Sequence, residues 1–219
     1  MTARRFDLLV FDWDGTLVDS AGHIASSIQA ACADLDLPVP SREAARHIIG
    51  LGMRDALAYV LPELEENRYR DVADRYRHHF LAGDEGIETF PMVDDGLASL
   101  EDEGFLLAVA TGKSRVGLDR ALGKVAFGSR FVATRCGDEG FPKPHADMLR
   151  YLMDATGVEA DRTLMIGDTS HDLMLAGNAG ASALAVSYGA HPADTLLEHA
   201  PLACVDSFSD VMQWLAKNA

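Results

Sequence analysis

Residues 6–17 read Phe-Asp-Leu-Leu-Val-Phe-Asp-Trp-Asp-Gly-Thr-Leu, and this stretch carries most of the information about the fold. The apolar run ends at Phe11, and two acids, Asp12 and Asp14, follow at alternate positions before Gly15. A short apolar run bounded by acidic and small residues is typical of a buried strand. Residues at alternate positions of an extended chain share a side, so we expect both carboxylates on one side of the strand end.

This acidic pair favours phosphoryl transfer. Two like charges about 4 Å apart repel each other by roughly 4 kcal/mol at an effective dielectric constant of about 20, unless a cation lies between them or one carboxyl holds a proton. A divalent cation would let an anionic carboxylate approach an anionic phosphate, and a protonated second carboxyl would donate to a leaving oxygen. The pair by itself leaves open a simpler role, an acidic turn or helix cap after the strand.

Three further apolar runs predict strands, and helical spacing fills the segments between them. Strands that alternate with helices indicate a parallel sheet covered on both faces. We therefore predict an α/β fold, a doubly wound parallel sheet whose chemistry gathers at the carboxyl ends of the strands. The expected strands are Phe6–Phe11, Phe105–Ala110, Thr163–Ile166 and Ala183–Val186, and the expected helices are Val93–Glu103, Ser114–Leu122, His145–Ala155 and His171–Ala179.

One segment interrupts this alternation. From about residue 20 to residue 82 the pattern is helical throughout, and prolines and glycines separate the pieces. We predict an inserted α-helical cap domain over residues 19–83. The α/β catalytic core would then be built from residues 1–18 and 84–219.

Polar side chains follow the other predicted strands as well. Thr111 and Gly112 end the second apolar run, where a hydroxyl and free amides would suit a phosphate. Lys143 lies between two prolines and would clamp a phosphate or offset a nearby carboxylate. Asp168 and Asp172 follow the third run, and oxygen ligands of this kind suit magnesium. Taken singly these sites are also compatible with helix caps and a surface lysine, but together they mark one edge of the sheet.

The composition limits the classes of partner. The chain has 219 residues and a formal net charge of −15, from 19 Lys and Arg against 34 Asp and Glu. Such a surface repels nucleic acid backbones and anionic lipid, so we expect neither nucleic acid nor a membrane as main partner. No stretch resembles a secretory signal and the cysteines form no zinc-site spacing, so a reducing cytoplasm is the expected location.

At four places the sequence resembles the haloacid dehalogenase-like superfamily. Residues 12–16 (DWDGT) resemble its first motif, residues 110–114 (ATGKS) its second, Lys143 its third and residues 167–172 (GDTSHD) its fourth. The resemblance covers the whole chain, because residues 19–83 look like the helical cap of the phosphoglycolate phosphatase and β-phosphoglucomutase branch. It implies a Rossmann-like core with an inserted cap.

The resemblance implies a role for each acid. Asp12 would be the nucleophile that becomes an aspartyl-phosphate, and Asp14 would act as general acid and then as general base. Mg²⁺ is the expected cofactor, held by Asp12, by the backbone carbonyl of Asp14 and by Asp168, with Asp172 acting from behind these ligands or through a water. The dehalogenases and the phosphonate-cleaving branch of the superfamily lack an acid at the position of Asp14, and the transport ATPases carry a threonine there, so this residue favours a phosphatase or a phosphomutase.

The resemblance also implies the phosphate-binding residues. Thr111 and the Gly112 amide would bind the phosphoryl oxygens, and Lys143 would neutralise charge beside the nucleophile. Arg54 follows a glycine-rich loop of the cap and falls near the place where β-phosphoglucomutases hold a second phosphate. A solvated arginine at a helix start is the simpler interpretation of Arg54.

We therefore expect a Mg²⁺-dependent phosphatase for a small phosphorylated metabolite, with 2-phosphoglycolate as the leading candidate. A phosphomutase of the β-phosphoglucomutase type is the nearest alternative. A phospho-accepting signalling or binding protein is an alternative from a different class. Rapid turnover of a small substrate would distinguish an enzyme from such a protein. The sequence leaves open whether the protein is a monomer or a homodimer.

Overall fold

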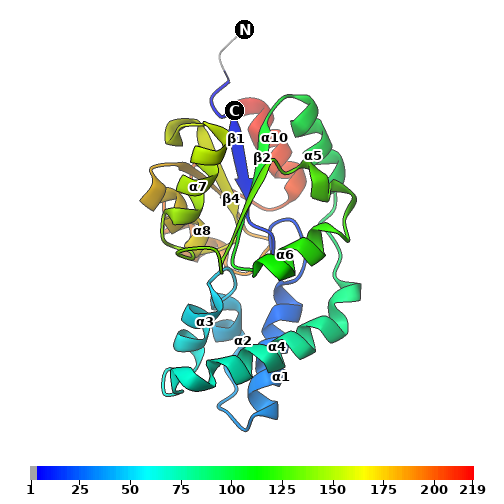
Figure 1. Cartoon of the computed structure of the whole chain (residues 1–219). Coiled ribbons are helices and arrows are strands. Elements are labelled where there is room, and N and C mark those ends of the chain that lie inside the picture. The colour runs from blue at the N-terminus through cyan, green and yellow to red at the C-terminus, as the bar shows by residue number, and fades with distance from the viewer. Residues whose placement is uncertain (1–3) are drawn as a thin grey trace.

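A six-stranded sheet forms the centre of the molecule in the computed structural model, which describes residues 4–219 (Figure 1). All strand pairs are parallel, in the order β3-β2-β1-β4-β5-β6, and Val10 of β1 lies opposite Ala108 of β2 and Met165 of β4. The predicted α/β fold is confirmed. The strands are β1 (Leu8–Phe11), β2 (Leu106–Thr111), β3 (Ala133–Cys136), β4 (Thr163–Gly167), β5 (Ser182–Val186) and β6 (Cys204–Val205).

Two strands were not predicted from the sequence patterns, and both lie at the edges of the sheet. β3 pairs with β2 at one edge, and β6 pairs with β5 at the other. β3 reads Ala-Thr-Arg-Cys and only its cysteine is buried, whereas β6 is two residues long. An edge strand is covered on fewer sides than a central one, so it needs no continuous apolar run and leaves a weak signal in the sequence.

The side chains of β1 alternate between two apolar cores, one on each face of the sheet. Leu8 and Val10 pack with residues of α7 and α8, whereas Leu9 and Phe11 pack with residues of α5 and α10. Because both faces are covered, the whole strand is apolar. The helices of this part are α5 (Val93–Asp102), α6 (Arg115–Leu122), α7 (Asp147–Thr156), α8 (Ser170–Ala179), α9 (Ala193–Leu197) and α10 (Phe208–Asn218).

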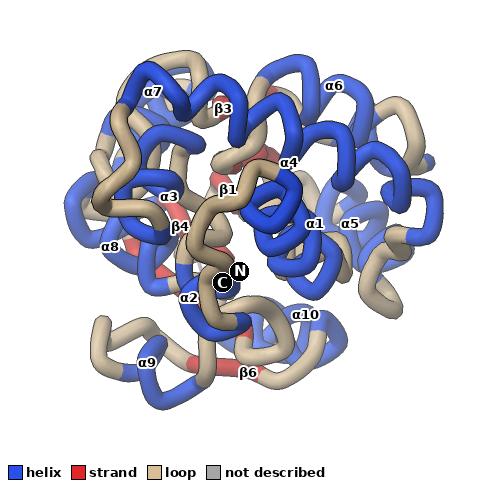
Figure 2. The backbone as a smooth tube through the Cα atoms, turned by 90° about the horizontal axis from the view of Figure 1, so that it is seen from below, coloured by secondary structure: helices blue, strands red, loops and turns tan. Residues whose placement is uncertain are grey.

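Four helices lie together beyond the carboxyl ends of the strands (Figure 1). They share an apolar cluster that includes Ile28, Leu57 and Val72. The view from this end shows α1 and α4 side by side (Figure 2). The arrangement agrees with a helical insert, and the domain boundaries at residues 18/19 and 83/84 stay predictions. The helices are α1 (Ala21–Asp34), α2 (Arg42–His47), α3 (Met53–Val60) and α4 (Tyr69–Gly83).

The connections include short 3₁₀ turns at Glu66–Arg68, Asp84–Gly86, Ala126–Arg130 and Ala160–Arg162. None of the helices within residues 4–219 is long and apolar enough to cross a membrane. Residues 1–3, which the prediction assigned to the core, lie outside the described residues.

Candidate active site

Three carboxylates from neighbouring strands meet at the carboxyl edge of the sheet. Asp12 directly follows β1, and Asp168 and Asp172 follow β4, the strand beside it. One oxygen from each of the three lies within 4.8 Å of the others, and all three residues are buried. Adjacent parallel strands end at the same edge of a sheet, which explains how residues far apart in the sequence come together.

Lys143 binds two of these carboxylates. Its ammonium nitrogen Nζ lies 2.9 Å from Asp12 Oδ1 and 2.5 Å from Asp172 Oδ1. The side chain is fully buried, so water screens neither ion pair as it would at the surface. The structure therefore places Lys143 within the carboxylate cluster and excludes the surface position that the sequence had left open.

Asp168 is held on both oxygens. Thr16 Oγ1 donates to its Oδ1 at 2.8 Å, and the backbone nitrogen of Ala190 donates to its Oδ2 at 2.6 Å. Gly15 gives the carboxylate the room that it needs, because a Cβ at this position would lie 2.1 Å from Asp168 Oδ2. The φ of Gly15, +83°, also disfavours any other residue.

Asp172 combines a role at the site with a role in α8. Its Oδ2 accepts from the backbone nitrogen of Thr169 at 3.1 Å and from the Thr169 hydroxyl at 2.7 Å, which caps the helix start. Its Oδ1 contacts Lys143. The helix cap that the sequence allowed as a simpler interpretation is thus present, and the same carboxylate also orients the lysine.

Burial sets the protonation of the cluster. It raises the pKa of Asp12 well above the ordinary value, and the charge of Lys143 offsets part of this rise. Burial, and then the charge of Asp172, raise the pKa of Asp168 to about 7. For Lys143, burial opposes the charged form, but the charges of Asp12 and Asp172 outweigh it and raise the pKa above its usual range. Without a further cation, burial therefore opposes the ionised forms of Asp12 and Asp168.

The donor set of the cluster fits a divalent cation. Asp12 Oδ2 is buried and has no hydrogen-bond partner within residues 4–219. Asp12, Asp168 and Asp172 together can hold an ion, and all their donor atoms are oxygens, which hard cations prefer. A bound cation would favour the ionised forms of Asp12 and Asp168, which burial opposes.

Asp14 lies in a different set of contacts. The hydroxyl of Ser20 donates to its Oδ1 at 2.6 Å, and Lys113 Nζ lies 2.9 Å from the same oxygen. The Lys113 ammonium also lies 4.7 Å from the centre of the Phe80 ring of α4. The sequence reasoning assigned no role to Lys113, although it directly follows Thr111 and Gly112 in the second motif.

Thr111 and Gly112 lie where β2 meets the helical cap. Thr111 is buried, and its hydroxyl accepts a hydrogen bond from the Lys113 backbone nitrogen at 3.2 Å. A Cβ on Gly112 would lie 2.6 Å from the carbonyl oxygen of Gly50 and 2.7 Å from that of Leu51. The cap loop therefore rests directly on the segment that the sequence predicted to bind phosphate.

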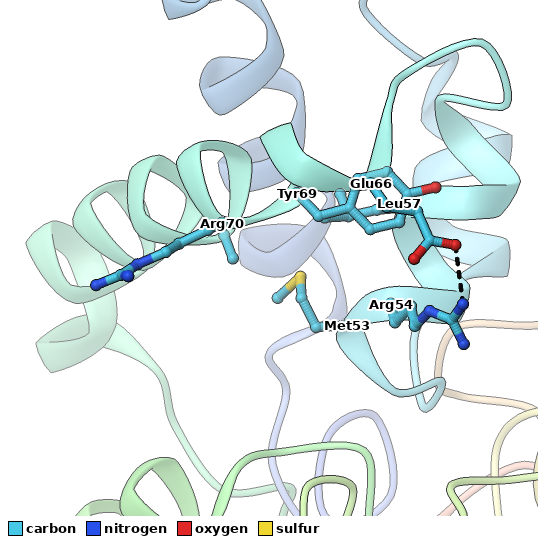
Figure 3. A pocket seen from close by; sticks show the side chains of 7 residues that line it. Met53, Arg54, Leu57, Glu66, Tyr69 and Arg70 are labelled. Atoms are coloured by element: carbon cyan, nitrogen blue, oxygen red, sulfur yellow. Dashed lines mark hydrogen bonds and ion pairs between the residues drawn. The ribbon is translucent and has the colours of Figure 1, made fainter.

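Arg54 is not brought into this cluster. Its guanidinium pairs with Glu66 at 2.8 Å, and its side chain is 74% exposed. It lines a pocket within the cap, and Figure 3 shows the Arg54–Glu66 pair at one side of that pocket, with the guanidinium of Arg70, another lining residue, directed away from this pair. The structure thus gives Arg54 a solvated position at a helix start, and its contact with substrate stays a prediction.

Comparisons with known proteins agree with this geometry. The profile of the haloacid dehalogenase-like hydrolases matches residues 9–186. The chain is 37% identical over 211 residues to the probable phosphatase IndB of Dickeya dadantii (strain 3937), covering 94% of this chain and 91% of that protein. It is 30% identical to a phosphoglycolate phosphatase of Agrobacterium fabrum (strain C58), with 95% and 92% covered.

Two further similarities come from a nucleotidase and a solved structure. The chain is 31% identical to a 5'-nucleotidase of Pseudomonas aeruginosa (strain ATCC 15692), with 91% of this chain and 90% of that protein covered. The crystal structure of a predicted phosphoglycolate phosphatase from Haemophilus somnus 129PT matches with a TM-score of 0.83 at 26% identity, covering 96% of this chain and 98% of that chain.

The chain belongs to the haloacid dehalogenase-like hydrolases. The resemblance drawn from its four motifs is thereby confirmed, together with the expected enzyme class, a phosphoric monoester hydrolase. An aspartate cluster that could hold a metal ion lies at the carboxyl ends of β1 and β4.

Proposed function

We propose that this chain is a Mg²⁺-dependent phosphatase that hydrolyses a small phosphorylated metabolite through an aspartyl-phosphate on Asp12. The Asp12 carboxylate supports this proposal most strongly. Its Oδ1 contacts Lys143 Nζ at 2.9 Å and accepts from the Trp13 backbone nitrogen at 2.7 Å, whereas its Oδ2 has no partner within the described chain. The carboxylate is thus oriented through Oδ1 and has an oxygen without a hydrogen-bond partner, as a nucleophile that shares its site with a cation requires.

In the first half of the reaction, the Asp12 carboxylate attacks phosphorus, and the bond from phosphorus to the leaving oxygen breaks. Lys143 offsets the negative charge that gathers between the carboxylate and the phosphoryl group. Asp14 gives its proton to the leaving oxygen, so the first product leaves as an alcohol. The Thr111 hydroxyl and the Gly112 amide are the proposed donors to the phosphoryl oxygens.

In the second half, a water attacks the phosphorus of the aspartyl-phosphate, and the bond to Asp12 breaks. Asp14, now ionised, takes a proton from this water, so inorganic phosphate leaves and both aspartates return to their starting state. The Ser20 hydroxyl, 2.6 Å from Asp14 Oδ1, keeps the carboxyl in place through both steps.

The proposed ligands of Mg²⁺ are Asp12, the backbone carbonyl of Asp14 and Asp168. Asp172 is proposed to contact these ligands or to bind the ion through a water. When bound, the ion supplies Lewis acidity and offsets the charge of the phosphoryl group. The chain contributes a fixed orientation of Asp168 through Thr16 and Ala190 and a buried, dry surrounding. The all-oxygen donor set supports Mg²⁺ over softer metals.

We propose 2-phosphoglycolate as the substrate. Relatives that carry the name phosphoglycolate phosphatase support this choice. Lys113 supports it too, because its ammonium lies beside Asp14, the proposed proton donor to the leaving group. A leaving group with its own carboxylate would be attracted to that ammonium, whereas a neutral leaving group would gain little from it.

A phosphate-release assay over a panel of phosphate esters tests this function. With Mg²⁺, 2-phosphoglycolate should give the highest kcat/KM, and EDTA should abolish turnover until Mg²⁺ is added back. The panel includes 5'-nucleotides and β-glucose 1-phosphate, and conversion of the latter to glucose 6-phosphate would indicate a mutase. If no ester on the panel released phosphate, the proposed phosphatase activity would be contradicted. A preference for another ester would contradict only the choice of 2-phosphoglycolate as substrate. A cytoplasmic location and a monomeric or homodimeric state stay predictions.

A further inference from the structure

The helical cap contacts the loop that holds Asp168, at a place that the proposed mechanism does not use. On the cap side the contact is made by the end of α2, which carries Arg46 and His47. On the other side lie residues 189–191, which follow β5, and the start of α8.

Arg46 binds two successive carbonyl groups of this loop. Its Nε donates to the Ala190 oxygen at 3.1 Å, and its Nη2 donates to the Gly189 oxygen. The same two peptide groups bind Asp168 through their nitrogens. Ala190 N donates to Asp168 Oδ2 at 2.6 Å, and His191 N donates to the Asp168 carbonyl at 3.2 Å. Each peptide plane therefore has the guanidinium at its oxygen and Asp168 at its nitrogen.

Through these two peptide groups, the position of the Arg46 guanidinium affects the position of the Asp168 carboxylate. A peptide group is planar, so an arginine that fixes the carbonyl oxygen also fixes the direction of the N–H at the other end. A positive charge at the oxygen polarises the peptide and strengthens the hydrogen bond that its N–H donates. The planar guanidinium suits two acceptors at once, which a lysine ammonium does not reproduce.

Two histidines hold the same end of α2. Nε2 of His171 and Nε2 of His191 lie 2.8 Å and 3.1 Å from the carbonyl oxygen of His47. The Ser170 nitrogen donates to His191 Nδ1 at 3.1 Å, so the neutral ring carries its proton on Nε2 and donates it to His47. Burial lowers the pKa of His191 to about 4, which keeps this ring neutral at ordinary pH.

The three imidazoles of His47, His171 and His191 lie close enough together to be considered as a metal site. Both nitrogens of His191 are already engaged, however, one as acceptor and one as donor. No lone pair of that ring is free for a metal, so we interpret the cluster as hydrogen bonds that hold the cap against the core.

We infer that Arg46 is a positioning residue for Asp168, so that contact between the cap and the 189–191 loop raises the affinity of the carboxylate cluster for its cation. The inference rests on the proposed function, because it takes Asp168 as a metal ligand. Linkage makes the effect reciprocal, so a cation bound at Asp168 favours the contact with the cap.

Binding of Mn²⁺, followed by electron paramagnetic resonance without substrate, tests the inference. Arg46→Met removes the donors and retains most of the length of the side chain. Partners behind a metal ligand typically contribute 10- to 100-fold to affinity, so we expect Mn²⁺ binding to weaken by about tenfold or more. Turnover by Arg46→Met should therefore be low at low Mg²⁺ concentration, and its kcat should return to that of the unaltered protein at high Mg²⁺ concentration. Arg42→Met, at an exposed position of the same helix, is the matched control and should bind Mn²⁺ as the unaltered protein does.

Thermal unfolding in EDTA shows whether each variant is folded. If Arg46→Met unfolds, Arg46→Lys replaces it, and intermediate Mn²⁺ affinity is expected because the charge remains and the planar fork is lost. Unchanged Mn²⁺ affinity in a folded Arg46 variant would overturn the inference while leaving the proposed phosphatase intact. An unaltered protein that binds no Mn²⁺ would instead contradict the metal-dependent function on which the inference rests.

Discussion

Asp12, Asp168 and Asp172 are buried together, and the Lys143 ammonium pairs with Asp12 and with Asp172. Burial raises the pKa of Asp12 and of Asp168, so both groups are held in a surrounding that opposes their charged forms. A strongly perturbed pKa among buried groups that converge on one place marks a candidate functional site. At the residue scale, substitutions in the cluster should therefore affect chemistry more than folding.

Asp12→Asn should abolish turnover without unfolding the protein. The amide cannot attack phosphorus, so phosphate release should fall by at least about a thousandfold. The substitution also removes a carboxylate that burial disfavours, so the melting temperature in EDTA should stay the same or rise. Asp19→Asn, at an exposed acid nearby, is the control for both measurements. Retained turnover would remove Asp12 from the mechanism, and a large fall in melting temperature would indicate a structural role instead.

Lys113→Met should change substrate preference. Its ammonium contacts Asp14 at 2.9 Å and is largely buried, so its loss should weaken binding of an anionic leaving group. A lost hydrogen bond to a charged group costs about 1.5–3 kcal/mol, which predicts a fall of about tenfold or more in kcat/KM for 2-phosphoglycolate. The ratio to kcat/KM for p-nitrophenyl phosphate is the informative quantity, with Lys217→Met as an exposed control. An equal fall for both substrates would contradict this role.

At the scale of elements, the site depends on a close approach between the end of β2 and the loop that precedes α3. The carbonyls of Gly50 and Leu51 lie against Gly112, where a side chain has no room. A further contact brings Gly52 against Pro142, the neighbour of Lys143 in sequence. At both places a glycine backbone is packed closely against the other part of the molecule, against carbonyl oxygens at Gly112 and against the proline ring at Gly52, which leaves little freedom for adjustment.

Gly112→Ala should disrupt this approach. The added Cβ would lie 2.6 Å from the Gly50 oxygen, so the cap loop must move away from the predicted phosphate-binding segment. A displacement of about 1 Å near an active site costs about a hundredfold in rate, and we expect kcat/KM to fall by that order. Gly177→Ala in α8 is the control, because nothing lies within 4 Å of the added atom. Unchanged kinetics in Gly112→Ala would show that the contact is not needed for turnover.

The central strands of the sheet could be predicted from the sequence, whereas the strands at its two edges could not. Each of the four predicted strands has ends within two residues of the observed ones, because strands covered on both faces need continuous apolar runs. β3 and β6 were not predicted, because a strand at the edge of a sheet does not need a continuous apolar run. No role was predicted for Lys113, for a different reason. Its partner Asp14 follows β1, whereas Lys113 follows β2, and a local sequence pattern does not indicate which segments come into contact.

At the scale of the whole molecule, the buried acids should make folding depend on pH in the absence of metal. The carboxyl of Asp168 has an ordinary pKa of 3.8 and a pKa of about 7 in the folded protein. Between these values the folded state holds a proton at Asp168 that the unfolded state lacks, so the contribution of Asp168 to the free energy of unfolding should fall as pH rises from about 4 to about 7. His191 has a pKa lowered from 6.5 to about 4, so its own contribution changes in the opposite direction below about pH 6.5, and the Asp168 effect is read as a difference between variants. Mg²⁺ binds only the folded cluster and should reduce this loss.

Melting temperatures across this pH range, in EDTA and in Mg²⁺, measure the effect. Asp7 and Glu139 have lowered pKa values, mainly through hydrogen bonds from Arg162 and from Arg115, and their contributions to stability are lost only below this window. Asp168→Asn removes the Asp168 contribution, so in EDTA the melting temperature of the unaltered protein minus that of Asp168→Asn should fall as pH rises from about 4 to about 7. A difference that is independent of pH, or that rises over this window, would contradict the prediction.

The residue patterns alone were enough to predict the α/β architecture and the helical segment after the first strand and to locate the four motifs, because each of these depends on neighbours along the chain. Folding alone determined which side chains touch. Lys143 between Asp12 and Asp172, Lys113 at Asp14, and Arg46 behind the loop of Asp168 are contacts between distant segments. Their partners are set by packing of the cap and by the order of the strands, which no local spacing encodes.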